Sequence, residues 1–453
     1  MNSVNKILVY VLLLGFITSC SKKQDTKSGS EVSSGQTSVS QKEKVKITFL
    51  NEDLIGKQKE VIESQLKKFA KENPDIEVKL MTYRPGTDKV LVMIAGNVAP
   101  DIFFINRVDI PAYISKGALL NITPYIAKSK IIKETDFFPA TLVTYRWNGK
   151  KIGEGDLYGL PKDFSPDAML FYNKDLFDKA GVPYPSSTES LPWDKFIELA
   201  KKLTKADSSG RIAQYGVYMG ASLYPMFIES NGGKLFSDDQ KRCLIDSKEC
   251  VEAIRAVTDL ALKHKVCPPI QVTRDVDPSI MFRTEKLAMS FFGRWSVPNF
   301  REELKFRWGV APAPHLKKRV NIMYGPNGFA IYKNTKYPEQ AFRLLEFLVG
   351  PDHQRAMGRL GWNIPTNKIA AYSKDFLDNP EHPEGINKIF IDEEKYTIPA
   401  PSNPYINFWR MLTEAENEIY MYYTGRCDLE TALKRAAERI NRIIDEEVRK
   451  SSK

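Results

Sequence analysis

The sequence predicts an α/β fold of the doubly wound kind, in which helices cover both faces of a mainly parallel sheet. From residue 45 onward, strand-like and helix-like stretches alternate, and this alternation is typical of such folds. Residues 101–105 read DIFFI, a nearly continuous apolar run that suits a strand buried on both faces. The length of 453 residues favours two domains over one.

The first α/β units can be followed in order along the chain. VKITFL (45–50) and IEVKLMTY (76–83) are rich in β-branched and aromatic residues and predict strands. Asn73-Pro74 ends the helix between them. One apolar face of that helix is formed by Val61, Ile62, Leu66, Phe69 and Ala70.

A second α/β set follows. A helix with period 3.6 starts near Trp193, with Ser190 as its candidate N-cap. Two long amphipathic helices end the chain, the last of them starting near Asp428. Three further stretches predict strands: 168–173, 286–293 and 327–334.

The N-terminus resembles a bacterial lipoprotein signal. Lys6 precedes an apolar run of 11 residues, Ile7–Ile17, which is too short to cross a hydrocarbon core of about 30 Å as a stable helix. The run ends in Ile-Thr-Ser-Cys, so we expect a signal peptide over 1–20 and lipidation of Cys20. A plain signal peptide or an anchor helix is the alternative. Residues 21–44 are rich in Ser, Gly and Lys and predict a flexible tether.

Charge and motifs exclude several function classes. The formal net charge is +10, but no dense basic block with interleaved aromatics is present, which argues against a nucleic-acid surface. The sequence contains no Walker loop, no G-x-G-x-x-G after a strand, no G-x-S-x-G and no H-E-x-x-H. We therefore expect no cofactor and no metal. Carboxylates are plentiful, so an acid/base pair of the glycoside hydrolase kind stays open, although none stands out.

Four cysteines remain after Cys20, and an even number in an exported protein permits disulfides. Cys243 and Cys250 are the nearest pair, with Cys250 in the first turn of a predicted helix. A bridge between these two is one expectation, and free buried thiols are the other.

Several stretches, taken in order, resemble bacterial extracellular solute-binding proteins of the sugar-binding type, which serve ABC importers. The resemblance covers about residues 45–450. It is carried by PDIFFINRVDIPAYISKGALLNITPYI (100–126), FYNKDLFDKAGV (171–182), WDKFIELAKKLT (193–204), ESNGGKLF (229–236), MSFFGRWSVPNF (289–300) and GPNGFAIYKNTKYPEQAFRLLEFL (325–348).

This resemblance implies a two-lobed periplasmic-binding-protein fold (type II) with hinge-linked lobes and a ligand cleft between them. GLPKDF (159–164) would be the first hinge crossing. The expected division is lobe 1 at 45–161, lobe 2 at 162–311, a return to lobe 1 at 312–366, and a helical part at 367–453 that belongs mainly to lobe 2.

The implied function is capture of a mono- or oligosaccharide outside the cytoplasm and its delivery to ABC transporter permease subunits. Closure of two lobes on a solute gives the transporter a form to recognise. We expect a monomeric, membrane-anchored lipoprotein of the cell envelope that binds no nucleic acid and is not an enzyme.

Sugar hydroxyls require planar hydrogen-bonding partners, and sugar C–H faces require aromatic platforms. Asn51, Glu52, Asp53, Asn106 and Asp109 follow strands, where helix capping is their alternative role. The remaining candidates are Asp163, Tyr224, Trp295, Asn327 and Trp362. Among these, Asp163, Tyr224 and Trp295 match contact positions of the family. Asn327, within GPNG (325–328), has a glycine on either side that would let a ligand approach the backbone, and core packing is the alternative for Trp295 and Trp362.

One departure puts a maltodextrin ligand in doubt: Ile105 stands where the maltose-binding type has an aromatic platform. Arg107 and Arg294 could instead serve a phosphate. The alternatives are therefore the same fold binding glycerol phosphate, a polyamine or a metal, or an exported carbohydrate-active enzyme.

Overall fold

The computed structural model describes residues 43–54, 56–84, 89–378 and 385–451. The expected signal peptide, the lipidation of Cys20 and nearly all of the expected tether lie outside these residues. Lys44–Lys453 form one compact unit. In the part of the chain that is described, no helix is both long enough and apolar enough to cross a membrane.

A six-stranded sheet contains the N-terminal strands. β1 pairs in parallel with β2 and β3, whereas β13 runs antiparallel between β3 and β6. The sheet is therefore mixed, because a late segment of the chain returns to its centre. The strands, in spatial order, are β14 (Ile364–Pro365), β6 (Leu160–Phe164), β13 (Asn327–Ile331), β3 (Ile102–Ile105), β1 (Val45–Glu52) and β2 (Ile76–Tyr83).

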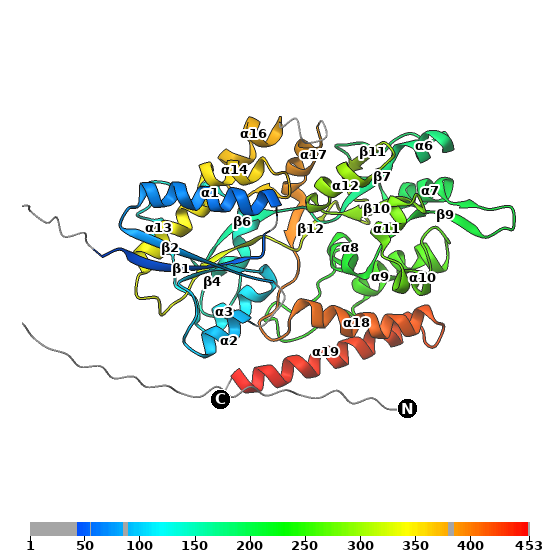
Figure 1. Cartoon of the computed structure of the whole chain (residues 1–453). Coiled ribbons are helices and arrows are strands. Elements are labelled where there is room, and N and C mark those ends of the chain that lie inside the picture. Colours follow the sequence, from blue (N-terminus) through cyan, green and yellow to red (C-terminus); the bar gives the residue numbers. More distant parts are fainter. Residues whose placement is uncertain (1–42, 55, 85–88, 379–384, 452–453) are drawn as a thin grey trace, which may run out of the picture. The chain divides into compact units, whose positions relative to one another are not determined.

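Burial explains why these segments form this sheet. All four residues of β3 are buried, as the apolar run DIFFI predicts. α1 (Gly56–Glu72) buries Ile62 and Phe69 from its predicted apolar face. In Figure 1, α1 and α13 (Pro338–Val349) lie on one side of the sheet, and α2 (Lys89–Ala95) and α3 (Ile110–Ser115) lie on the other.

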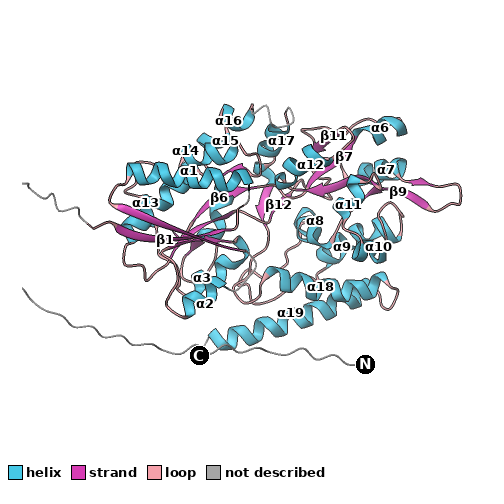
Figure 2. Cartoon of the chain, viewed as in Figure 1, coloured by secondary structure: helices cyan, strands magenta, loops and turns pink. Residues whose placement is uncertain are grey.

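A five-stranded sheet forms the second lobe. β10 pairs antiparallel with β7 and parallel with β9. The spatial order is β11 (Trp308–Ala311), β7 (Met169–Asn173), β10 (Leu287–Phe292), β9 (Ile212–Val217) and β8 (Lys205–Ala206). The two long C-terminal helices, α18 (Phe408–Tyr423) and α19 (Leu429–Ser451), contribute to the hydrophobic core of this lobe (Figure 2). The two-lobed α/β fold expected from the resemblance is confirmed.

One local prediction is corrected. α7 (Trp193–Leu203) starts where expected, but its N-cap is Pro192. Ser190 instead donates its hydroxyl to the Ala313 carbonyl at 2.5 Å and lies 2.8 Å from His315 Nδ1. Its role is to hold two loops together, which local sequence cannot reveal.

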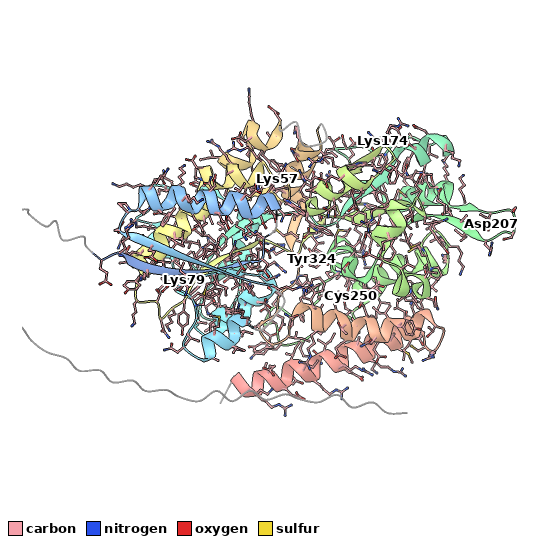
Figure 3. The ribbon with its side chains drawn as sticks, viewed as in Figure 1. Lys57, Lys79, Lys174, Asp207, Cys250 and Tyr324 are labelled. Atoms are coloured by element: carbon pink, nitrogen blue, oxygen red, sulfur yellow. The ribbon has the colours of Figure 1, made fainter. Side chains whose placement is uncertain are left out.

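Of the two expectations for Cys243 and Cys250, the structure shows free buried thiols and not the bridge. Cys250 (Figure 3) donates its thiol to the Lys234 carbonyl at 3.4 Å. Burial raises the pKa of the Cys243 thiol to about 12 and that of Cys250 to about 11. Both thiols therefore stay protonated at neutral pH and behave as small apolar residues.

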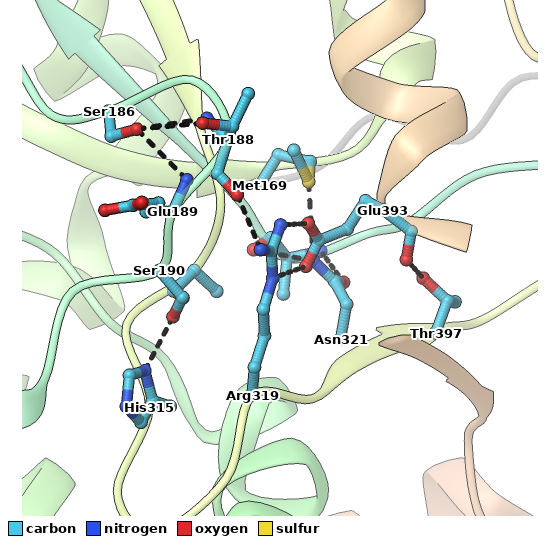
Figure 4. A network of polar contacts seen from close by, with 12 residues as sticks. Met169, Ser186, Thr188, Glu189, Ser190, His315, Arg319, Asn321, Glu393 and Thr397 are labelled. Atoms are coloured by element: carbon cyan, nitrogen blue, oxygen red, sulfur yellow. Dashed lines mark hydrogen bonds and ion pairs between the residues drawn. The ribbon is translucent and has the colours of Figure 1, made fainter. Parts of the chain in front are cut away.

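A buried polar network fixes one junction between the lobes (Figure 4). β12 (Asn321–Met323) pairs in parallel with β15 (Thr397–Pro399). Beside them, Glu393 pairs with Arg319, and its backbone carbonyl accepts the Thr397 hydroxyl at 2.8 Å. Asn321 Oδ1 accepts the Ala168 amide at 3.1 Å, next to the start of β7. These bonds hold β12 in place. Along the chain, β12 lies between β11 of the five-stranded sheet and β13 of the six-stranded sheet.

Candidate ligand-binding cleft

A polar cavity of about 230 Å³ lies at the end of β1 and β6. β1 ends with Glu52 and β6 contains Asp163, so the carboxylates come from different strands of one sheet. The sequence-predicted residues that line this cavity are Asn51, Glu52, Asp53, Asp163, Asn327 and Trp362.

Lys162 organises the carboxylates of the polar cavity, and it was not among the predicted residues. Its Nζ lies 2.9 Å from Glu52 Oε1 and 2.5 Å from Asp163 Oδ2. Burial opposes its charge, yet the two carboxylates outweigh burial and raise the pKa of Lys162. The lysine holds both carboxylates in place and leaves part of their acceptor capacity for a ligand.

Three buried atoms in the polar cavity have no hydrogen-bond partner in the described chain: Asn51 Oδ1, Asn363 Oδ1 and His353 Nδ1. Burial, followed by the charge of Lys162, lowers the pKa of His353 to about 3, so its ring is neutral. Buried polar atoms without partners are rare in native proteins and cost about 1–3 kcal/mol each. Each of these atoms is closed to solvent in this structure, so a hydroxyl-rich ligand would reach them only once the surrounding side chains move.

A hinge cavity of about 190 Å³ adjoins the polar cavity and shares Asp163, Asn327 and Asn363 with it. Of the predicted residues, Asn106 and Trp295 also line it. Its further lining includes Asp167, Tyr324 and Trp409, which the sequence prediction missed. Figure 3 shows Tyr324 near the middle of the molecule. The hinge cavity is therefore built from both lobes and from the crossing segments.

Asp167 is, with Asp163, one of the two carboxylates that line the hinge cavity. Its Oδ2 accepts the Tyr324 amide at 2.6 Å. Burial raises the pKa of Asp167 to about 6, although hydrogen bonds, including those from Ser165 and Trp295, act to lower it. A side chain at Gly293 would collide with Asp167 Oδ1 and Trp295 Nε1 and push these two side chains from their present positions.

Two tryptophans stand in the cleft with much of their surface free. Trp295 is 49% exposed and Trp409 is 46% exposed. Trp409 stacks on Tyr324 with ring centroids 5.5 Å apart and an interplanar angle of 25°. Exposed aromatic faces beside carboxylates are the surfaces that a sugar ring requires, since one side of the ring is apolar and its edge is polar.

Two further cavities continue into the second lobe. A tryptophan cavity of about 300 Å³ shares Asp167, Trp295, Tyr324 and Trp409 with the hinge cavity. A tyrosine cavity of about 280 Å³ lies against α18. Tyr224, which is only 4% exposed, lines this tyrosine cavity.

Asp109 is not among the residues that line these four cavities, and it stands at the N-cap position of α3. Eight of the ten predicted residues line the polar or hinge cavity, and Tyr224 lines the tyrosine cavity. Asp167, Tyr324 and Trp409 had no local signal: they meet only because the chain crosses between lobes and α18 packs beside the crossing.

Neither arginine proposed for a phosphate lines any of the four cavities, and both are fully buried. Arg294 donates to Asn387 Oδ1 at 2.8 and 3.0 Å and also to the Gly361 carbonyl. Burial lowers the pKa of Arg294 to about 9 and that of Arg107 to about 10. Among the described residues, no arginine lines any of these four cavities. The described residues also contain no group of three or more His, Cys, Asp or Glu placed to hold a metal.

The model of the family described as "Bacterial extracellular solute-binding protein" matches residues 54–355. The chain belongs to this family. The sequence of this solute-binding protein is 25% identical over 336 residues to that of the multiple sugar-binding protein of Streptococcus mutans. The match covers 69% of this chain and 73% of the Streptococcus protein.

Other solute-binding proteins widen the range of ligands among its relatives. The chain is 22% identical over 406 residues to the sn-glycerol-3-phosphate-binding periplasmic protein of Shigella flexneri, covering 84% of this chain and 89% of that one. The solved ABC substrate-binding protein of Listeria monocytogenes in complex with cycloalternan is similar at a TM-score of 0.73 and 25% identity. That similarity covers 89% of this chain and 100% of the Listeria chain.

Proposed function

We propose that this solute-binding protein is a lipoprotein, anchored through Cys20, that captures a carbohydrate by closing two lobes on it and delivers it to an ABC transporter permease. One observation supports the proposal above others. In the polar and hinge cavities, carboxylates and unpartnered buried acceptors lie beside exposed tryptophan faces. A sugar complements these groups, because its hydroxyls can donate hydrogen bonds to the acceptors and its apolar ring face can stack on a tryptophan.

The proposed contacts divide by chemistry. Glu52, Asp163 and Asp167 accept hydrogen bonds from sugar hydroxyls, and Asn51 and Asn327 provide amide groups. Trp295 and Trp362 provide stacking faces. The lobes that close are proposed to be 45–161 with 312–366, and 162–311 with most of 367–453.

The acidic lining bears on the choice among solutes. Glu52, Asp53, Asp163 and Asp167 line the polar and hinge cavities, and Lys162 is the basic residue among their lining. Like charges repel most strongly where burial lowers the dielectric. An anionic solute such as glycerol phosphate would therefore bind poorly, and we favour an uncharged sugar.

A thermal-shift screen of the purified protein tests the proposal. The panel contains mono-, di- and oligosaccharides, glycerol 3-phosphate and polyamines, with a glycoside-hydrolysis assay run alongside. A ligand at 100 times its Kd stabilises the fold by about 2.7 kcal/mol, so a clear rise in Tm with a sugar and no turnover is expected. A shift with glycerol 3-phosphate or a polyamine alone would contradict carbohydrate capture and keep the family assignment.

A further inference from the structure

The four cavities are neighbours in a series, because each shares lining residues with the next. The polar and hinge cavities share Asp163, Asn327 and Asn363, and the hinge and tryptophan cavities share four residues, among them Trp295. The tryptophan and tyrosine cavities share Tyr218 and Gly220. The series therefore runs from the end of β1 in one lobe to the face of α18 in the other.

Gly220 lies in the wall that the tryptophan and tyrosine cavities share. It lies in extended backbone at φ −96°, so this position requires no left-handed conformation. A Cβ at this position would lie 2.7 Å from the Tyr218 hydroxyl, which is closer than van der Waals contact allows. Any side chain here would push the Tyr218 ring, which lines both the tryptophan and the tyrosine cavity, out of its present position.

The volumes favour a long ligand over a short one. The single cavities measure about 190 to 300 Å³, whereas ligand sites generally measure roughly 300–1,000 Å³. Each cavity has room for roughly one sugar ring, and the four together reach the upper end of the range of a complete site. A monosaccharide would leave most of the aromatic lining without a contact.

The tyrosine cavity has the chemistry of a sugar subsite although it lies outside the polar and hinge cavities. Its walls include Tyr218, Tyr224 and Tyr420. Glu416 and Asn417, on the same face of α18, also line it. Among the described residues, neither of these two side chains has a hydrogen-bond or ion-pair partner, so their polar groups are available to hydroxyls at the far end of a ligand.

We propose that the ligand is a linear oligosaccharide of about three or more rings, with one end in the polar cavity and the other in the tyrosine cavity. This inference rests on the proposed function. Glu416, Asn417 and Tyr420 then determine how the protein responds to ligand length. Trp295 and Trp409 stack on the middle of the chain.

Calorimetric titration with length series tests this inference. The probes are glucose, arabinose and xylose, each followed by its linear oligomers of two to six units: α-1,4-glucans, α-1,5-arabinans and β-1,4-xylans. The series of the sugar that gives the largest thermal shift in the screen is added. We expect the affinity to rise at least tenfold between the monosaccharide and the tetrasaccharide.

Variants of α18 identify the far end of the ligand. Asn417→Ala with Tyr420→Ala should lower the ratio of tetrasaccharide to disaccharide affinity about tenfold, and Gly220→Val should act in the same direction. Arg410→Ala, an exposed change on the same helix, should leave that ratio unchanged and controls for the helix itself.

Three outcomes are distinct. A gain in affinity with length that the α18 variants remove supports the inference. A monosaccharide that binds as tightly as its tetramer, or variants that weaken every length equally, would overturn the inference and leave carbohydrate capture standing. A protein that binds no carbohydrate at all would overturn the proposed function together with the inference.

Discussion

Two groups of polar residues lie near the junction of the lobes, and they differ in how fully the protein satisfies them. At β12 and β15, Glu393, Arg319 and Asn321 are paired with one another and with the backbone. In the polar cavity, Asn51 and Asn363 each leave a buried oxygen without a partner. A satisfied network stabilises a fold, whereas an unsatisfied one beside a cavity indicates a ligand site.

This difference can be tested by measuring stability and affinity separately. Substitutions in the satisfied network should reduce the stability of the fold, whereas substitutions in the cavities should reduce the affinity for the ligand. The sharpest case is Arg319→Met, which leaves the fully buried Glu393 side chain without its cation. Removing one partner of a buried pair costs about 3–5 kcal/mol. Urea denaturation should show a loss of that size in the free energy of unfolding.

Lys318→Met is the matched control for Arg319→Met. Lys318 is 54% exposed and pairs with Glu229 at the surface, and such pairs contribute about 0–1 kcal/mol. Equal losses in the two variants would contradict the assignment of Arg319 to the stabilising network.

Within the cleft, Trp295→Ala should have the largest effect on affinity. Loss of an aromatic face is expected to cost about 1–3 kcal/mol, or roughly five- to 150-fold in Kd for the sugar identified by the screen. Calorimetric titration measures this change in Kd, and urea denaturation should show a much smaller change in stability than Arg319→Met gives.

Tyr337→Ala is the control for Trp295→Ala. It removes an aromatic residue that is 38% exposed and lines none of the four cavities. It should leave Kd unchanged; equal weakening by both variants would refute the stacking role.

Asp163→Asn keeps the shape of the side chain and removes its charge. Hydrogen bonds to charged groups contribute about 1.5–3 kcal/mol. Lys162 still pairs with Glu52 in this variant, so the second carboxylate stays in place. We therefore expect a loss at the lower end of this range, which is about a tenfold weaker Kd. Asp375→Asn, at a surface ion pair with Arg359, is the control in the same titration. An unchanged Kd for Asp163→Asn would remove this residue from the site.

A separate effect is a dependence of stability on pH. Burial raises the pKa of Asp167 to about 6, above its value near 3.9 in an unfolded chain. Between about pH 4 and 6 the folded state therefore holds more protons, and this group's contribution to stability falls as the pH rises. Urea denaturation across this range should show the unchanged protein losing stability relative to Asp167→Asn. Parallel curves would contradict the raised pKa.

The elements could be predicted from sequence where local pattern determines them. β2 has the predicted bounds, and β3 is buried as its apolar run indicates. Asn51 and Glu52 could be found because they end a strand. Trp409 could not, because it reaches the cleft only through the packing of α18, and Ser190 has a partner distant in sequence. Lys162 was missed because a lysine in a hinge segment has no pattern that distinguishes it from a surface charge.

The most direct measurement is a crystal structure of the protein with the sugar that binds most tightly. The account predicts one ring on the face of Trp295, hydroxyls donating to Asp163 and Asp167, and partners for the free oxygens of Asn51 and Asn363. It also predicts that Arg319 and Glu393 remain paired and touch no ligand atom. A ligand bound away from these cavities, or held by Arg107 or Arg319, would contradict the division between cleft and network.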